Sequence, residues 1–185
     1  MRVVSGQSKG RRLLAPRGFV VRPTAAKVKE ALFDILANLV AGARVLDLFA
    51  GTGGIGIEAL SRGAESVDFV ERHPPSRKVL EENLKRCGYQ SRARIHRLDA
   101  FRYLRQAARA VVPFDIVFVD PPYHTGILKK VLPLLSQDVI ITHAGVVIIE
   151  HFHKTELPDA LGPLHRFRAQ RYGDTVLSFY RRKAA

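Results

Sequence analysis

The sequence contains a single cysteine, Cys87, in 185 residues. One cysteine cannot build a disulfide framework within the chain, which excludes the small disulfide-stabilised secreted domains. No apolar run approaches the roughly 18 residues that a membrane-spanning helix needs. The charged N-terminus is followed by neither an apolar core nor a small-residue cleavage site. No internal repeat, low-complexity tract or clear linker is present, and we expect a cytoplasmic protein without membrane association.

Acidic residues are scarce at both ends of the chain. Residues 1–30 contain eight Lys or Arg and one acid, and residues 165–185 contain six and one. The segment between them has 16 basic and 15 acidic residues, in a chain of net charge +13. A near-neutral body with basic ends is typical of enzymes that bind polyanions. A basic protein that binds nothing is the alternative.

Short apolar runs alternate with segments of helical periodicity through most of the chain. This alternation predicts a parallel sheet with helices on both faces. At 185 residues the chain has the size of one α/β domain. We therefore predict a doubly wound, mostly parallel sheet. The runs that we expect to be its strands are residues 43–49, 66–71, 93–99, 114–120 and 145–151.

The two ends depart from this alternation. Residues 22–39 carry the pattern of an amphipathic helix with Thr24 as its N-cap. Near the C-terminus, strand-like runs flank Gly173-Asp174 and predict an antiparallel hairpin that closes one sheet edge. Residues 1–21 show only hints of period two, and we expect a small basic β extension there. The predicted organisation is an extension over 1–21 and one domain over 22–185.

A glycine-rich loop, LDLFAGTGGIG, follows the first expected strand. Gly51, Gly53 and Gly56 have the G-x-G-x-x-G spacing of nucleotide-binding loops between a strand and a helix. Glu71 lies 20 residues beyond Gly51 and can accept hydrogen bonds from ribose hydroxyls. The N–H groups at the start of the next helix favour an anionic group. These features alone leave a nicotinamide cofactor as an alternative.

Two further carboxylates change this balance. Asp47 precedes Gly51 by four residues, where it would repel a pyrophosphate and attract an ammonium group. Asp99 ends the third expected strand and can accept a hydrogen bond from an adenine amino group. S-adenosylmethionine has an ammonium, a sulfonium, a ribose and an adenine, and it has no phosphate. Each acid alone would fit a cap or a turn, but three at successive strand ends favour S-adenosylmethionine.

The stretch FDIVFVDPPYHTG places Asp120, Pro121, Pro122 and Tyr123 at the end of the fourth expected strand. Proline cannot donate to a sheet ladder, so the strand stops there. The Asp120 side chain and the Pro121 carbonyl can then accept hydrogen bonds from both N–H groups of an amine. These bonds would make the nitrogen lone pair available to attack an activated methyl group. Tyr123 offers a flat face for a flipped-out base. A strand stop beside a surface tyrosine is the alternative.

These motifs resemble those of the S-adenosylmethionine-dependent methyltransferases with a seven-stranded, Rossmann-like sheet. Within them the chain is similar to the bacterial 16S rRNA guanine-N2 methyltransferases, named for guanine 966. The likeness runs nearly end to end, and one departure is His73, where a polar or acidic residue is expected. The motifs that carry it are MRVVSGQSKGRRL, RPTAAKVKEALFDIL, VLDLFAGTGGIGIEALSRGA, FVE, DIVFVDPPY and YGDT.

The resemblance implies roles for three sets of residues. The residues expected to bind the guanine amine and to catalyse the transfer are Asp120, Pro121, Pro122 and Tyr123. The residues expected to hold S-adenosylmethionine are Thr24, Asp47, Phe49, Gly51, Gly53, Glu71, Asp99 and Ala100. The residues expected to bind rRNA are Arg2, Lys9, Arg11, Arg12, Arg17 and Arg22.

Several alternatives remain open at this level. A DNA adenine-N6 methyltransferase uses a similar turn, although the chain has no evident separate target-recognition domain. A protein glutamine methyltransferase fits poorly with such basic ends, and a nicotinamide dehydrogenase does not explain Asp120. A non-catalytic rRNA-binding assembly factor would keep the pocket as a relic. We expect a monomer that acts on 16S rRNA or a small-subunit assembly particle. No metal is expected, because His151 and His153 have no third ligand nearby in sequence.

Overall fold

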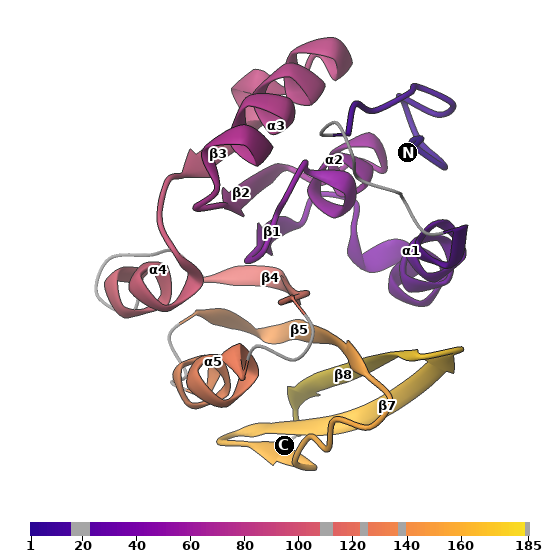
Figure 1. Cartoon of the computed structure of the whole chain (residues 1–185). Helices are drawn as coiled ribbons and strands as arrows, with labels where there is room; N and C mark the ends of the chain where they lie inside the picture. Colours follow the sequence, from indigo (N-terminus) through magenta and orange to yellow (C-terminus); the bar gives the residue numbers. More distant parts are fainter. Residues whose placement is uncertain (16–22, 108–112, 123–125, 137–139, 184–185) are drawn as a thin grey trace.

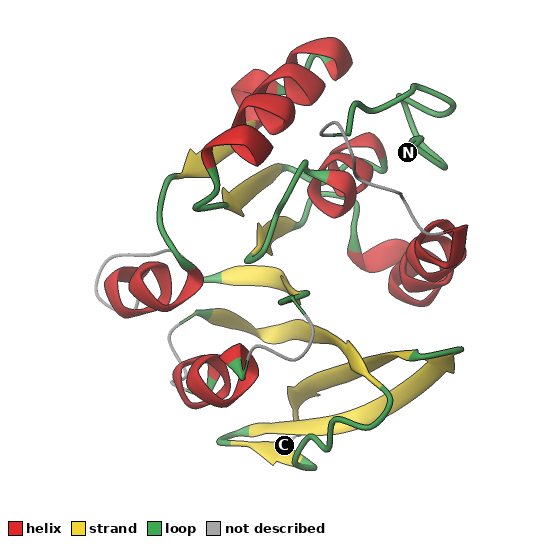
Figure 2. Ribbon diagram, in the orientation of Figure 1, coloured by secondary structure: helices red, strands yellow, loops and turns green. Residues whose placement is uncertain are grey.

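The computed structural model describes residues 1–15, 23–107, 113–122, 126–136 and 140–183. Figure 1 shows these elements in chain order, and Figure 2 shows how helices and strands divide the molecule. The helices are α1 (Pro23–Leu36), η1 (Ala37–Leu39), α2 (Gly54–Ser61), α3 (Pro74–Cys87), η2 (Gln90–Arg92), α4 (Ala100–Ala107) and α5 (Ile127–Leu135). The strands are β1 (Arg44–Asp47), β2 (Ser66–Val70), β3 (Ala93–His96), β4 (Phe114–Val119), β5 (Ile141–Phe152), β6 (Ala160–Leu161), β7 (Leu164–Tyr172) and β8 (Thr175–Arg182).

One mixed sheet contains all eight strands, in the order β3-β2-β1-β4-β5-β8-β7-β6. The first five strands along the chain pair in parallel, as the sequence predicts. β7 and β8 form the predicted antiparallel hairpin, in which Tyr172 pairs with Thr175 across Gly173-Asp174. The sheet thus has the seven strands expected from the resemblance, and the two-residue strand β6 adds an eighth at its edge.

The two faces of the sheet bury separate apolar clusters. One cluster joins α1, α2 and α3 to alternate strand residues such as Val45, Ile116 and Phe118. The other joins α4 and α5 to the intervening residues, among them Leu46 and Val117. In Figure 1, α4 and α5 lie on one side of β4 and β5, and α1 and α2 lie on the other. This three-layer arrangement follows from continuous apolar strands that are buried on both faces.

Strand order reverses between β1 and β4, and this fixes where a ligand can bind. β2 and β3 lie on one side of β1, whereas β4 and β5 lie on the other. The helices that follow β1 and β4 therefore turn to opposite faces, and a crevice forms beyond the carboxyl ends of these strands. The glycine loop follows β1, and the Asp-Pro-Pro turn follows β4.

The N-terminal segment packs on the domain instead of forming a sheet of its own. Val3 and Leu13 are buried in the cluster of α1, α2 and α3. Within residues 1–15, the only β pairing is a single antiparallel bridge between Arg2 and Arg12, so the expected β extension is reduced to this bridge. Four further N–H groups of the segment, those of Val4, Ser5, Ser8 and Leu14, donate to side chains of α2 and α3.

Three local features differ from the sequence-based expectations or extend them. The helix α1 begins at Pro23, so Thr24 lies in its first turn and does not precede it as an N-cap. The helix α5 continues through Pro133 to Leu135. Among the described residues, none of the helices combines the length and the apolar character needed to cross a membrane.

Candidate active site

An open cavity of about 1690 Å³ lies beyond the carboxyl ends of β1, β2, β4 and β5. Small-molecule pockets usually measure roughly 300–1,000 Å³, so this cavity has room for more than one small ligand. The predicted site residues that line it are Phe49, Gly51, Glu71, Asp99, Ala100, Asp120, Pro121 and Pro122. The topology therefore brings together residues that lie up to 73 positions apart in the sequence.

Glu71, directly after β2, ties the glycine loop to the next turn. Its Oε2 accepts a hydrogen bond from the Gly51 N–H at 2.8 Å, and its Oε1 accepts one from the His73 N–H at 2.6 Å. The carboxylate thus fixes the loop at the cavity wall. Each oxygen has further acceptor capacity, which the ribose hydroxyls of a nucleoside could use.

Asp47 is the last residue of β1 and lies beneath the cavity wall. Its side chain is buried, and its Oδ2 accepts a hydrogen bond from the Gly56 N–H in α2 at 3.1 Å. Burial, the largest effect, and the charge of Glu71 together raise the pKa of Asp47 to about 7, against the lowering effect of the backbone N–H groups of Gly56 and Phe49. Asp47 is therefore poised between its two protonation states near neutral pH, and a nearby cation would favour the ionised form.

Two glycines of the loop occupy positions where a larger residue would be strained or would clash with a neighbour. Gly53 precedes α2 with φ of 86°, a left-handed conformation, and a Cβ there would collide with Leu80. A Cβ at Gly56 would collide with the ring of Phe69 in β2. These two glycines serve backbone conformation and close helix–sheet packing, while Gly51 lines the cavity.

Asn83 links the glycine loop to the N-terminal segment. This fully buried side chain of α3 donates through Nδ2 to the Thr52 carbonyl at 3.0 Å and to the Leu14 carbonyl at 3.2 Å. Its Oδ1 accepts from the Leu14 N–H at 2.7 Å. One amide therefore connects the loop with residue 14, near several of the basic residues expected to grip RNA.

Asp99 lines the cavity and directly precedes α4. Its Oδ1 accepts a hydrogen bond from the Arg102 N–H at 3.0 Å, which is the geometry of an N-cap. Ala100 and the partly exposed Phe101 line the cavity beside it. The residue therefore caps the helix and also faces the cavity, so the two interpretations of Asp99 are compatible.

Asp120 follows the last residue of β4 and faces the cavity with Pro121 and Pro122. Burial raises the pKa of the Asp120 carboxyl well above its ordinary value, and the charges of Glu150 and Asp47 raise it further. Asp120 and Glu150, which line the cavity, and Asp47, which is buried beneath its wall, thus form one cluster of carboxyl groups. A cluster of this kind favours a cationic ligand, although the whole chain has a net charge of +13.

Further residues of the cavity were not predicted from the sequence. Glu150 near the end of β5 repeats the pattern of an acid after an apolar run, so the signal was present in GVVIIEH. Lys129 and Lys130 line the cavity from α5, and Thr175 lines it from the start of β8. Thr175 is the last residue of the YGDT motif, whereas no motif marks Lys129 or Lys130 in the sequence.

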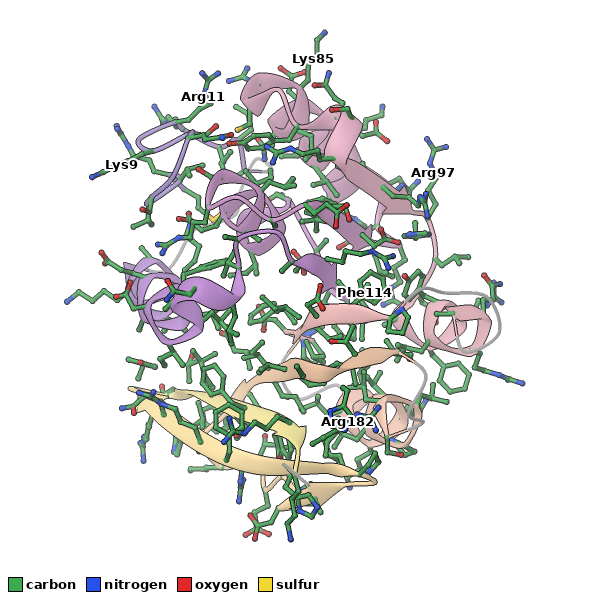
Figure 3. All side chains as sticks on the ribbon, turned by 180° about the vertical axis from the view of Figure 1, so that it is seen from behind. Lys9, Arg11, Lys85, Arg97, Phe114 and Arg182 are labelled. Carbon is green, nitrogen blue, oxygen red and sulfur yellow. The ribbon has the colours of Figure 1, made fainter. Side chains whose placement is uncertain are left out.

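The remaining predicted residues lie elsewhere. Arg2, Lys9, Arg11 and Arg12 are exposed on the N-terminal segment, outside the cavity. Figure 3 shows Lys9 and Arg11 projecting outward, and Arg11 donates a hydrogen bond to the Arg86 carbonyl at the end of α3. The positions that lie outside the described residues are Arg17, Arg22, Tyr123 and the side chain of Thr24.

The histidines near the end of β5 have protein partners of their own. His151 Nε2 lies 2.9 Å from Ser178 Oγ, and His153 Nδ1 lies 3.4 Å from Asp174 Oδ1. Within the part of the chain that the structure describes, no group of three His, Cys, Asp or Glu side chains could hold a metal ion.

Comparison with known proteins assigns this chain to a family. The family model described as "Conserved hypothetical protein 95" matches residues 1–181. The chain belongs to this family.

Similar proteins align with this chain over nearly its full length. YlbH of Bacillus subtilis, provisionally named an rRNA methyltransferase, is 41% identical over 99% of this chain and 100% of its own. "Ribosomal RNA small subunit methyltransferase D" of Escherichia coli is 32% identical over 100% of this chain and 91% of its own. The solved structure of yhhF from Escherichia coli, provisionally named a methyltransferase, has a TM-score of 0.88 and 32% identity, over 100% of this chain and 99% of that one. The fold is that of the Rossmann-like methyltransferases.

The acids around the loop predict a measurable effect on cofactor binding. If Glu71 and Asp47 hold the nucleoside as predicted, Glu71→Ala and Asp47→Ala should each weaken S-adenosylhomocysteine binding about tenfold, because each would remove a charge that interacts with the ligand. In the wild type the affinity should rise from pH 6 to pH 8, because Asp47, with a pKa of about 7, ionises over this range. Asp47→Ala should flatten that rise. Isothermal titration calorimetry at several pH values measures both effects.

Glu65→Ala provides the control, because Glu65 is exposed before β2, at the opposite end of the sheet from the cavity. Its affinity and pH profile should match those of the wild type. Unchanged affinity in both the Glu71 and the Asp47 variants would show that this pocket does not hold the nucleoside.

Proposed function

We propose that the protein transfers a methyl group from S-adenosylmethionine to the exocyclic N2 amine of a guanine in 16S rRNA. The observation that carries this proposal is the position of Asp120 and the Pro121 carbonyl. They end β4 at the switch point of the sheet, next to a glycine loop that is surrounded by acids. The rRNA methyltransferase names of relatives that match this chain end to end support the same substrate class.

The residues of the cavity fit S-adenosylmethionine better than a dinucleotide. Glu71 and Asp99 line the cavity, and Asp47 lies buried beneath it. A pyrophosphate would meet these carboxyl groups, whereas an ammonium and a sulfonium would be attracted to them. Glu71 is placed to hold the ribose, and Asp99 with Ala100 is placed to hold the adenine. When bound, S-adenosylmethionine supplies an electrophilic methyl group.

The protein residues orient the amine and stabilise its charge. Asp120 and the Pro121 carbonyl accept the two N–H bonds of the amine, so the nitrogen lone pair points away from them. The nitrogen becomes cationic as it forms the new bond to carbon, and the Asp120 carboxylate stabilises that charge. The nitrogen then loses a proton to regain its neutral form.

The RNA would reach this site across basic surfaces. The exposed Lys9, Arg11 and Arg12 lie on the N-terminal segment, and the hairpin β7–β8 adds Arg168 and Arg181. Lys129 and Lys130 on α5 line the cavity itself and are placed to meet the phosphates next to the acceptor base. The volume beyond that of a nucleoside would hold this flipped-out nucleotide. We infer that the protein works in the cytoplasm, where the small subunit is assembled.

The direct test compares 16S rRNA from a strain that lacks the protein with rRNA from its parent. Mass spectrometry of RNase fragments should show one N2-methylguanine in the parent and an unmethylated guanine in the mutant. The purified protein should restore the mark on mutant RNA or on small-subunit particles. An N6-methyladenine product would indicate the adenine alternative. Cofactor binding without any transfer would indicate a non-catalytic assembly factor.

Charge reversal at the N-terminal segment should weaken RNA binding without affecting the cofactor. Each phosphate contact contributes about −0.7 to −0.9 to the slope of log K against log salt. Reversing Arg11 and Arg12 to Glu should therefore make binding weaker and that slope shallower by roughly two contacts. Filter binding of a small-subunit RNA fragment from 50 to 300 mM salt measures both quantities.

The matched control combines Arg11→Lys with Arg12→Lys. It keeps both charges, and a lysine ammonium in place of the Arg11 guanidinium can still donate to the Arg86 carbonyl. This control should keep the salt slope of the wild type. RNA affinity that responds neither to salt nor to the charge reversal would show that the N-terminal segment does not bind the RNA.

A further inference from the structure

Asp120 and Glu150 occupy equivalent positions on neighbouring parallel strands. In the register of β4 and β5, Val119 pairs with Ile149, so Asp120 and Glu150 are the next residues along each strand. Glu150 also pairs with Leu177 of β8, whose side chain belongs to the cluster of α1, α2 and α3. Both Asp120 and Glu150 line the cavity. Two carboxyl groups thus lie side by side at the carboxyl edge of the sheet.

The pKa of the Asp120 carboxyl group depends on its surroundings, which include Glu150. Burial is the largest effect on its carboxyl pKa, and the negative charges of Glu150 and Asp47 add to it, all in the upward direction. The ordinary value is 3.8, so Asp120 holds its proton to a much higher pH than an exposed aspartate does. A carboxylate with a raised pKa is a stronger base.

We propose that Glu150 is a positioning residue for the transfer reaction, which acts through Asp120 and makes it the base that removes the proton from the methylated amine. This inference rests on the proposed function. Neither residue forms a covalent bond to the substrate, and the role of Glu150 is electrostatic.

The proton balance of the step is simple. The amine nitrogen forms a bond to the methyl carbon, and the bond from that carbon to the sulfonium sulfur breaks with both electrons going to sulfur. The nitrogen then carries a positive charge and two protons. One of these protons passes to the Asp120 carboxylate, and the N-methylated amine of the base becomes neutral. The protonated Asp120 finally releases this proton to solvent through the open cavity.

Other charged groups surround the same site and must be considered. Asp47 contributes from β1, Glu71 from the end of β2, Lys129 and Lys130 from α5, and Asp174 from the hairpin turn. These groups are unchanged when Glu150 alone is substituted. A change in titration between wild type and variant therefore reports on Glu150.

The test is the pH dependence of single-turnover methyl transfer, with cofactor and RNA saturating. The rate should rise with pH as Asp120 ionises. Glu150→Gln removes the neighbouring negative charge, so the midpoint of the rise should move to lower pH by roughly one unit or more. The plateau rate should also fall about tenfold, because Asp120 becomes a weaker base. Glu150→Asp keeps the charge and should keep the midpoint close to that of the wild type.

An infrared titration tests the same pair without RNA or turnover. The wild-type protein should show C=O absorption from protonated carboxyl groups near neutral pH, to which Asp47, with a pKa of about 7, also contributes. The Asp120 band is the part of this absorption that Asp120→Asn removes. Glu150→Gln should shift the midpoint of that band downward, and the exposed control Glu65→Gln should leave it unchanged. Equal midpoints in the wild type and Glu150→Gln would overturn the inference. Failure of the wild type to methylate RNA would overturn the proposed function instead, because the infrared result does not depend on it.

Discussion

Asp120→Ala is expected to lower the rate of methyl transfer by about 10²–10³-fold or more while cofactor binding persists. The carboxylate is proposed to accept an N–H bond of the amine and to face the positive charge that develops on nitrogen. An interaction that strengthens in the transition state affects kcat more than KM. The measurement is single-turnover transfer to a small-subunit substrate with saturating cofactor, next to a calorimetric titration with S-adenosylhomocysteine.

Two comparisons separate chemistry from folding in this experiment. Asp120→Asn keeps an acceptor oxygen but carries no charge and cannot take a proton, so its rate should lie between those of the wild type and Asp120→Ala. Because burial and like charges disfavour the ionised Asp120, its removal should not lower the thermal midpoint at neutral pH. An Asp120→Ala enzyme with a near wild-type rate would mean that the turn only ends the strand.

The parallel part of the sheet was predictable because its signals are local. Each central strand is an apolar run between turn residues, and the structure has strands within all five predicted ranges or overlapping them. The hairpin was predictable from Gly173-Asp174. The N-terminal segment was not, because four of its backbone N–H groups donate to side chains of Glu58, Ser61 and Asn83, more than 50 residues away. No local pattern encodes such partners.

The position of the site was also predictable, but its electrostatics was not. Acids after apolar runs marked the carboxyl edge of the sheet, and the structure gathers Glu71, Asp99 and Asp120 around one cavity there. The depth of each side chain depends on how helices pack over the strands. Asp47 is therefore buried below the cavity, with its pKa near 7, and Glu150 becomes the neighbour of Asp120 only through the strand order.

Glu58→Ala is expected to lower the free energy of unfolding by about 3–5 kcal/mol, because it leaves a buried cation without its partner. Glu58 in α2 is fully buried, and its carboxylate lies 2.9 Å from the Lys29 ammonium, which is only 4% exposed. The same carboxylate accepts the Val4 N–H at 2.8 Å and the Ser5 N–H at 2.9 Å. Loss of Glu58 therefore also removes two of the hydrogen bonds that hold the N-terminal segment on the domain. Urea unfolding followed by circular dichroism measures the change.

The chain contains a matched control for this substitution. Glu82 in α3 bonds to Arg86 four residues later at 2.9 Å, as Glu58 bonds to Arg62 at 3.0 Å, but the Glu82 side chain is 45% exposed. Glu82→Ala should change the stability by less than about 1 kcal/mol. Burial raises the pKa of Glu58, but the Val4 N–H and the Lys29 ammonium outweigh it and hold the pKa below its ordinary value of 4.5. The stability that Glu58 contributes is therefore present above that pH and is lost below it, so the wild type and Glu58→Ala should converge as the pH falls below 4.5. A Glu58→Ala protein as stable as Glu82→Ala at neutral pH would show that this ion pair does not hold the N-terminal segment in place.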